Sequence, residues 1–115
     1  MAAASYRADN LVAILDHNKV QATGTLDECM NIGDPEAKFA AFGWHVIRID
    51  GHDVAAIADA FDRADTLKGV PVIIIADTIK GKYISFAEGK AKFHNCSLTR
   101  EEYHQALRDI DLYEC

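Results

Sequence analysis

The longest apolar run in the chain is Val70-Pro71-Val72-Ile73-Ile74-Ile75-Ala76. Its β-branched residues make it the strongest strand signal in the sequence. A proline has no amide hydrogen to donate to a neighbouring strand, so Pro71 fits only near the beginning of this strand. The run is far too short to cross a bilayer, and we expect no membrane partner.

Two further segments predict strands. Residues 11–15, Leu-Val-Ala-Ile-Leu, form a nearly unbroken apolar run, as a strand covered on both faces requires, and polar residues 16–18 end it. Residues 44–49 are rich in β-branched side chains. Before the first strand, residues 1–7 have good helix propensity, which indicates either a short N-terminal helix or the tail of a longer one.

Helix signals lie between and after these strands. Residues 34–43 begin with an aspartate and a proline, which suit a cap and a first turn, and end with a stopping glycine. Asp53 suits the cap of a second helix, whose apolar residues follow helical spacing before Gly69. Residues 99–110 open with a threonine and a glutamate three positions later, the pattern of a capping box.

This alternation of strands and helices predicts right-handed parallel crossovers and a layered α/β fold. The length of 115 residues is that of one domain, residues 1–115, and no repeat or linker divides it. Against 12 lysines and arginines stand 18 acidic residues, giving a net charge of −6, so we expect no nucleic acid partner. The three cysteines form no CxxC pair, and no secretory signal is visible, so we expect reduced thiols and a cytoplasmic protein.

Candidate chemistry lies in the loops that follow the strands, where open α/β sheets bind ligands. After the first strand, Asn18 and neighbouring backbone carbonyls offer hard oxygen ligands of the kind that Mg²⁺ prefers, although such a segment more often forms a turn. After the strongest strand, Lys80 and Lys82 can contact phosphate, although a solvated loop is the simpler interpretation. No dinucleotide-binding or P-loop glycine pattern is present. His94 and Cys96 lack a second pair at zinc-site spacing.

Several segments taken together, in order, closely resemble the thiamine diphosphate-binding domain of transketolases. They are DNLVAILDHN at 9–18, AFGWHVI at 41–47, DGHD at 50–53, TIKGK at 78–82, ISF at 84–86 and FH at 93–94. The resemblance covers nearly the whole chain and is closest to the later half of the N-terminal subunit of two-subunit transketolases. It implies a three-layer fold in which helices flank a mostly parallel sheet, and an oligomer with sugar phosphates as substrates.

The resemblance also implies roles for individual residues. The side chain of Asn18 and the main-chain carbonyl of Val20 are expected to ligate Mg²⁺ beside the diphosphate of thiamine diphosphate. His94 is expected to lie by the diphosphate and the bound sugar, where it stabilises an oxyanion and positions the substrate. The segment 50–53 also matches the family, and we interpret it structurally, as a turn and a helix cap.

The chain departs from the family pattern at several positions. Lys19, Tyr83 and Asn95 stand where the family usually has glycine. The Gly-Asp-Gly that opens the family's diphosphate motif should lie roughly 30 residues before Asn18, and this chain has only 17 residues there. We therefore expect an N-terminally shortened domain, without the aspartate that shares the magnesium ion.

The implied activity is transfer of a two-carbon ketol unit between sugar phosphates, with thiamine diphosphate and Mg²⁺ as cofactors. A pyrimidine-binding domain or C-terminal transketolase subunit would complete the active site, so we expect the isolated chain to be inactive and to bind the cofactor weakly. The strand at 11–15 should have an unpaired edge, which assembly would cover. The alternative is a cofactor-free interaction or regulatory module derived from a transketolase.

Overall fold

A parallel three-stranded sheet forms the centre of the first of two compact units. The computed structural model describes residues 1–113, and this first unit comprises residues 1–17 and 32–78. The strand order is β1 (Val12–His17), β5 (Val72–Asp77), β4 (His45–Asp50), so the strongest predicted strand is central. Both neighbours pair with β5 in parallel, which confirms the predicted α/β fold.

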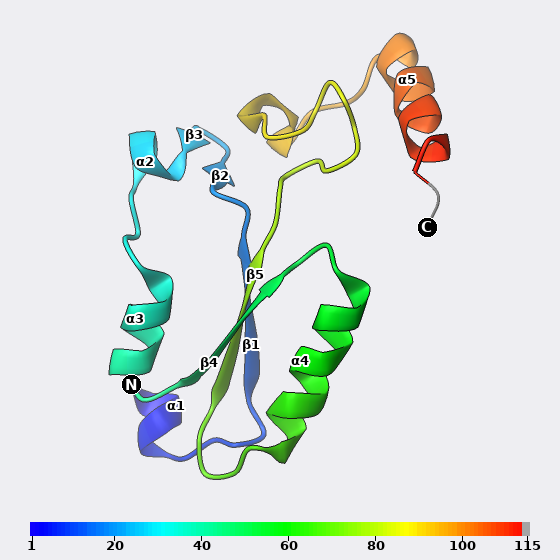
Figure 1. Cartoon of the computed structure of the whole chain (residues 1–115). Helices are drawn as coiled ribbons and strands as arrows, with labels where there is room; N and C mark the ends of the chain where they lie inside the picture. Colours follow the sequence, from blue (N-terminus) through cyan, green and yellow to red (C-terminus); the bar gives the residue numbers. More distant parts are fainter. Residues whose placement is uncertain (114–115) are drawn as a thin grey trace. The chain divides into compact units, whose positions relative to one another are not determined.

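Helices cover the two faces of this sheet. Figure 1 shows α4 (Val54–Thr66) on one side of the strands, and α1 (Ala2–Ser5) and α3 (Pro35–Ala41) on the other. Alternate residues of β5 point to opposite faces. Val72 and Ile74 pack in one cluster with Ala60 and Ala64 of α4, whereas Ile73 and Ile75 are buried on the other face.

Caps begin the helices where the sequence predicts them. The Asp34 side chain accepts the amide of Ala37 at the start of α3, and Asp53 accepts the amides of Ala55 and Ala56 at the start of α4. The segment 50–53 is a turn leading into this cap, as we interpreted it. A glycine is required at position 51, because a side chain there would overlap Thr78.

The first strand differs in part from its prediction. Residues 11–15 predict a strand covered on both faces, but β1 lies at an edge of the sheet and is only half-buried. Ile14 is 60% exposed, and no strand among residues 1–113 pairs with the outer side of β1. The expected unpaired apolar edge is therefore present.

The second unit comprises residues 18–31 and, among the described residues, 79–113. It contains the short antiparallel pair of β2 (Val20–Gln21) and β3 (Gly24–Thr25), then α2 (Leu26–Cys29), the 3₁₀ helix η1 (Ala91–His94) and α5 (Arg100–Asp111). The predicted capping box opens α5, where the Thr99 hydroxyl accepts the amide of Glu102 at 3.1 Å. No helix within the described part of the chain is long and apolar enough to cross a membrane.

Candidate functional site

The carboxyl ends of all three parallel strands carry polar side chains. In the sheet register His17, the last residue of β1, and Asp50, the last residue of β4, both stand opposite Asp77 of β5. Because parallel strands end at the same edge of a sheet, these residues lie level with one another. This edge is where α/β sheets place ligands.

An ionic network spans the three strands at this edge. The Asp77 carboxylate accepts a hydrogen bond from Nδ1 of His17 at 2.8 Å and two from Arg48, at 2.6 Å from Nε and 3.0 Å from the terminal nitrogen. The hydrogen bond from Arg48 is the main reason that the pKa of Asp77 is lowered to about 2. Arg48 also lies 3.8 Å from the carboxylate of Glu36 in α3, and its own pKa is raised by Asp77.

The first predicted site residue, Asn18, begins a tight turn in the second unit. Its side-chain oxygen accepts the backbone amide of Val20 at 3.0 Å, and the amide of Leu26 donates to the carbonyl of Lys19 at 3.0 Å. Lys19 has a φ of 63°, in the left-handed region that favours glycine. Val20 then starts β2, opposite Thr25 of β3.

The other predicted site residue, His94, ends η1 on the surface of the same unit. The hairpin strand β2 packs against η1, so the segment that carries Val20 lies beside the segment that carries His94. Phe93, the residue before the histidine, packs edge-on against Phe86 with ring centroids 5.3 Å apart. Asn18, Val20 and His94 therefore all belong to one compact unit, although distant in sequence.

Two of the three departures from the family's glycines have a backbone explanation. Lys19 and Tyr83 have φ angles of 63° and 74°, so both keep the conformation that glycine adopts most readily. Asn95 differs, because its φ of −154° is extended backbone open to any residue. At these two positions the chain therefore carries a side chain on a backbone conformation that favours glycine.

The oxygen atoms near Asn18 suit magnesium by type. The amide oxygen of Asn18, which accepts the Val20 amide, and the carbonyl of Val20 are both neutral hard oxygen donors. Within residues 1–113 no group of three or more His, Cys, Asp or Glu side chains could hold a metal ion. The donors fit a Mg²⁺ ion that shares its coordination with diphosphate and water, rather than an ion caged by side chains.

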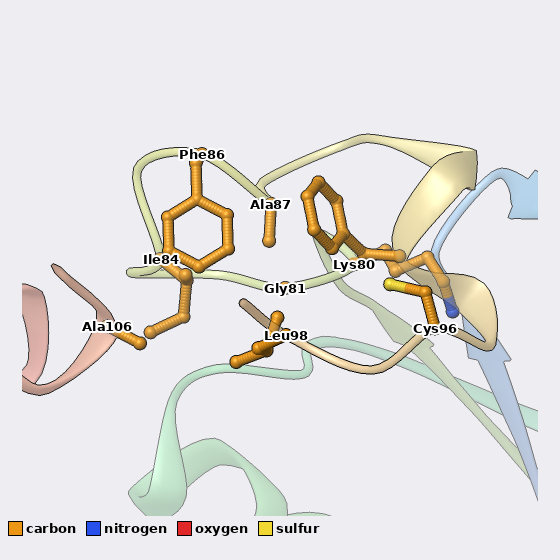
Figure 2. A pocket seen from close by; sticks show the side chains of 9 residues that line it. Lys80, Gly81, Ile84, Phe86, Ala87, Cys96, Leu98 and Ala106 are labelled. Atoms are coloured by element: carbon orange, nitrogen blue, oxygen red, sulfur yellow. The ribbon is translucent and has the colours of Figure 1, made fainter. Parts of the chain in front are cut away.

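A mainly apolar cavity, which was not predicted from the sequence, is lined by the loop after β5 together with η1, the segment that follows it and α5. Its volume is about 300 Å³, and Figure 2 shows Ile84, Phe86 and Leu98 among the side chains that line it. The complete lining is Lys80, Gly81, Ile84, Phe86, Ala87, Phe93, Cys96, Leu98 and Ala106. Apolar residues occur in the sequence both before and after η1, and they are the signal that could have indicated the cavity. The sequence does not show that these separate segments come together in three dimensions.

The two lysines named as phosphate contacts take different positions. Lys80 lines the cavity, whereas the ammonium of Lys82 lies 3.7 Å from the carboxylate of Glu88 and over the ring of Tyr83. Cys29 and Cys96 are in no disulfide among the described residues, and Cys115 lies outside them. The loop cations are therefore partly neutralised within the loop itself.

Comparison with known proteins gives consistent results. The family described as transketolase, thiamine diphosphate binding domain, matches residues 1–112. The 6-deoxy-6-sulfo-D-fructose transketolase subunit SqwG of Clostridium sp. (strain MSTE9) is 41% identical over 111 residues, which are 96% of this chain and 40% of that protein. One subunit of the apulose-4-phosphate transketolase of Phocaeicola vulgatus is 38% identical over 110 residues, covering 96% of this chain and 39% of the relative.

The similarity extends to solved structures. Transketolase from Campylobacter jejuni superposes with a TM-score of 0.87 at 29% identity, over 96% of this chain and 17% of that one. Human transketolase is 38% identical over 108 residues, 94% of this chain and 17% of the relative. The chain thus spans about 40% or less of the length of these relatives.

Proposed function

Since the chain belongs to the family of transketolase thiamine diphosphate-binding domains, we propose that it forms the diphosphate-facing part of a transketolase active site. In this proposal the assembled enzyme transfers a two-carbon ketol unit between sugar phosphates. The relatives that are subunits of transketolases act on modified sugars, and this chain's own donor and acceptor belong to the same broad class of phosphorylated or otherwise anionic sugars.

The packing of β2 against η1 carries this proposal. It brings the segment with Val20 and the segment with His94 together in one unit, with Asn18 at the start of the same hairpin. A diphosphate and its Mg²⁺ ion need oxygen ligands on one side and a hydrogen-bond donor on the other. The neighbouring segments offer these two kinds of group.

Each residue has a distinct role in the proposed site. The side-chain oxygen of Asn18 and the carbonyl of Val20 hold Mg²⁺, and His94 donates a hydrogen bond to the diphosphate and to an oxyanion of the sugar. Bound thiamine diphosphate supplies the carbanion chemistry, and the protein orients the reactants and excludes water. Both oxygens are neutral, so we expect these two residues by themselves to hold Mg²⁺ and diphosphate weakly.

The proposed partner is a pyrimidine-binding domain or a C-terminal transketolase subunit. Two relatives are themselves named as subunits, which supports a site completed by a second chain. The exposed edge of β1, with Ile14 60% exposed, is an apolar surface that an assembly would cover. The free thiols of Cys29 and Cys96 suit a reducing, cytoplasmic setting.

The test compares the full chain with and without this partner. Calorimetry with thiamine diphosphate and Mg²⁺ should give a Kd weaker than about 10 μM for the chain alone, and tighter binding with ketol transfer for the assembly. Replacing His94 by alanine in the assembly should lower kcat by about a hundredfold, the scale of one lost oxyanion donor.

His104→Ala is the matched control, because His104 is an exposed histidine of α5 in the same unit. Equal effects of the His94 and His104 substitutions would overturn the role of His94. If the chain assembled with the partner but the assembly did not bind the cofactor, the result would instead support a cofactor-free interaction module. The apolar edge of β1 could be the contact surface of such a module.

A further inference from the structure

Two side-chain pairs join the end of β1 to Asp77, the last residue of β5, and to Thr78, the residue after it, one pair on each face of the sheet. Nδ1 of His17 lies 2.8 Å from Asp77, and the hydroxyl of Thr78 donates to the carboxylate of Asp16. Successive side chains of a strand point to opposite faces, so the two pairs lie on opposite sides of the sheet. Together they hold the ends of the two strands at one level.

The pairs stand at the positions where the chain leaves the sheet. The first unit ends at His17 on one connection and at Thr78 on another, and the second unit begins with the residues that follow. The segments that carry Asn18 and His94 therefore both start directly after these paired residues. If either pair were lost, the residues from which these two segments start would be held less firmly.

Asp77 is the central residue of what we call the sheet-end network, which is His17, Arg48 and Asp77. Its carboxylate accepts three hydrogen bonds, and only 34% of its side chain is exposed. Because the pKa of Asp77 is lowered to about 2, the carboxylate is ionised at neutral pH. The contact of 2.8 Å between Nδ1 of His17 and this carboxylate holds the plane of the imidazole ring.

The turn that follows His17 needs such support. Lys19 is in the left-handed region, which costs an L-residue free energy, and such residues persist where the surrounding structure holds them. Within the turn the Asn18 oxygen accepts the Val20 amide, but the residue before the turn is held by Asp77. The side chain of His17 is only 11% exposed, so its ring has little freedom to move. The hydrogen bond to Asp77 therefore restricts the backbone of the residue directly before the turn.

We propose that Asp77 is a positioning residue for the Mg²⁺ and diphosphate site, acting through His17 on the turn that presents Asn18 and Val20. The proposal rests on the proposed function of these two residues and extends it to a residue that need not touch the cofactor. Asp77 thus resembles the outer-shell partners that orient metal ligands in other sites.

The first test uses the full chain without cofactor. In Asp77→Ala, NMR should show loss of the fixed orientation of the His17 ring and at least about tenfold faster hydrogen exchange of the Val20 amide. Asp77→Asn keeps two polar atoms that can contact His17 and Arg48, so it should increase Val20 exchange less than the alanine variant does. It replaces the alanine variant in the test if that variant does not fold. Asp59→Asn is the control, because Asp59 pairs with Arg63 at 3.7 Å on the exposed face of α4.

The second test uses the chain assembled with its partner. Asp77→Ala should weaken Mg²⁺ affinity by about 10–100-fold, while kcat at saturating Mg²⁺ and cofactor stays within about twofold. Unchanged Val20 exchange in both Asp77 variants would overturn the positioning role, whatever the cofactor does. A third outcome is that Val20 exchange is faster in the variants while the assembled wild type does not bind thiamine diphosphate. That result would support the positioning of the turn by Asp77 and would overturn the proposed function.

Discussion

The two units of the chain are stabilised in different ways. In the first unit the residues of β5 from Val72 to Ala76 are all buried, and Ile47, Ala60 and Ala64 pack with them. In the second unit, among its described residues, Ala87 and Asp109 are the buried ones. Asn18, Val20 and His94 all lie in this second unit, so the candidate site is built on the part with less apolar burial. Binding residues often lie on such loops beside a rigid scaffold.

The largest expected effect is in the first unit. Ile74→Ala removes a side chain that is 2% exposed, and such truncations cost about 2–5 kcal/mol of unfolding free energy. Ile84→Ala, at a half-buried position of the second unit, should cost about 1 kcal/mol. Urea unfolding followed by circular dichroism measures both values. Equal losses of unfolding free energy in the two variants would show that apolar burial does not stabilise the first unit more than the second.

Asp109 sharpens the comparison, because it is a polar anchor within the second unit. Its carboxylate accepts the amide and hydroxyl of Ser85, at 2.8 and 2.6 Å, and the side chain of Gln105 at 2.6 Å. These hydrogen bonds lower the pKa of Asp109, the one from the Ser85 hydroxyl most and those from Gln105 and the Ser85 amide next.

Asp109→Ala should therefore release α5 from the loop at Ser85 and leave the sheet intact. Hydrogen exchange should rise throughout α5, with no change in β5, and Asp111→Ala at the exposed end of the same helix is the control. Loss of protection in β5 as well would mean that the two units unfold together.

A pH titration tests the sheet-end network of the first unit. The pKa of Asp77 is lowered from 3.8 to about 2, chiefly by its hydrogen bond with Arg48, so the carboxylate stabilises the folded state fully above pH 3.8. This contribution is lost as the pH falls through about 2. Since a third of the side chain is exposed, we expect a loss of about 1–2 kcal/mol.

The measurement is the unfolding free energy of the wild type and of Asp77→Asn between about pH 5 and pH 2. The difference between the two proteins should shrink as the pH falls over that range. A constant difference would show that the charge of Asp77 contributes nothing to stability.

The smallest effect is a gain in the second unit. Lys19→Gly places glycine at a φ of 63° and should stabilise the protein by about 0.5–1 kcal/mol, because glycine adopts this region without steric cost. Lys90→Gly is the control at a φ of −102°, where glycine adds backbone entropy loss and removes the hydrogen bond from Lys90 to the Phe86 carbonyl, and it should destabilise. Thermal unfolding of both variants distinguishes these signs, and a loss of stability in Lys19→Gly would contradict the strain at this turn.

Sequence patterns predicted the first unit better than the second. The runs at 11–15, 44–49 and 70–76 correspond to β1, β4 and β5, because a buried strand needs a continuous or alternating apolar pattern. The hairpin of β2 and β3 was not predicted, since each strand has only two residues and no apolar period. The short helix α2 was also missed, although Thr25 and Glu28 form a capping box that the sequence does contain.

The amino-acid sequence by itself determined the parallel strands β1, β4 and β5, the capped helices α3, α4 and α5, and the family to which the chain belongs, because apolar runs, caps and motif residues follow one another along the chain. Tertiary structure alone decided that β1 is an edge strand with an exposed Ile14, that Arg48 and His17 meet on Asp77, and that β2 packs against η1. These pairings join residues far apart in sequence. They depend on which strand takes the central place and on how backbone turns redirect the chain, and neither is encoded in a local pattern.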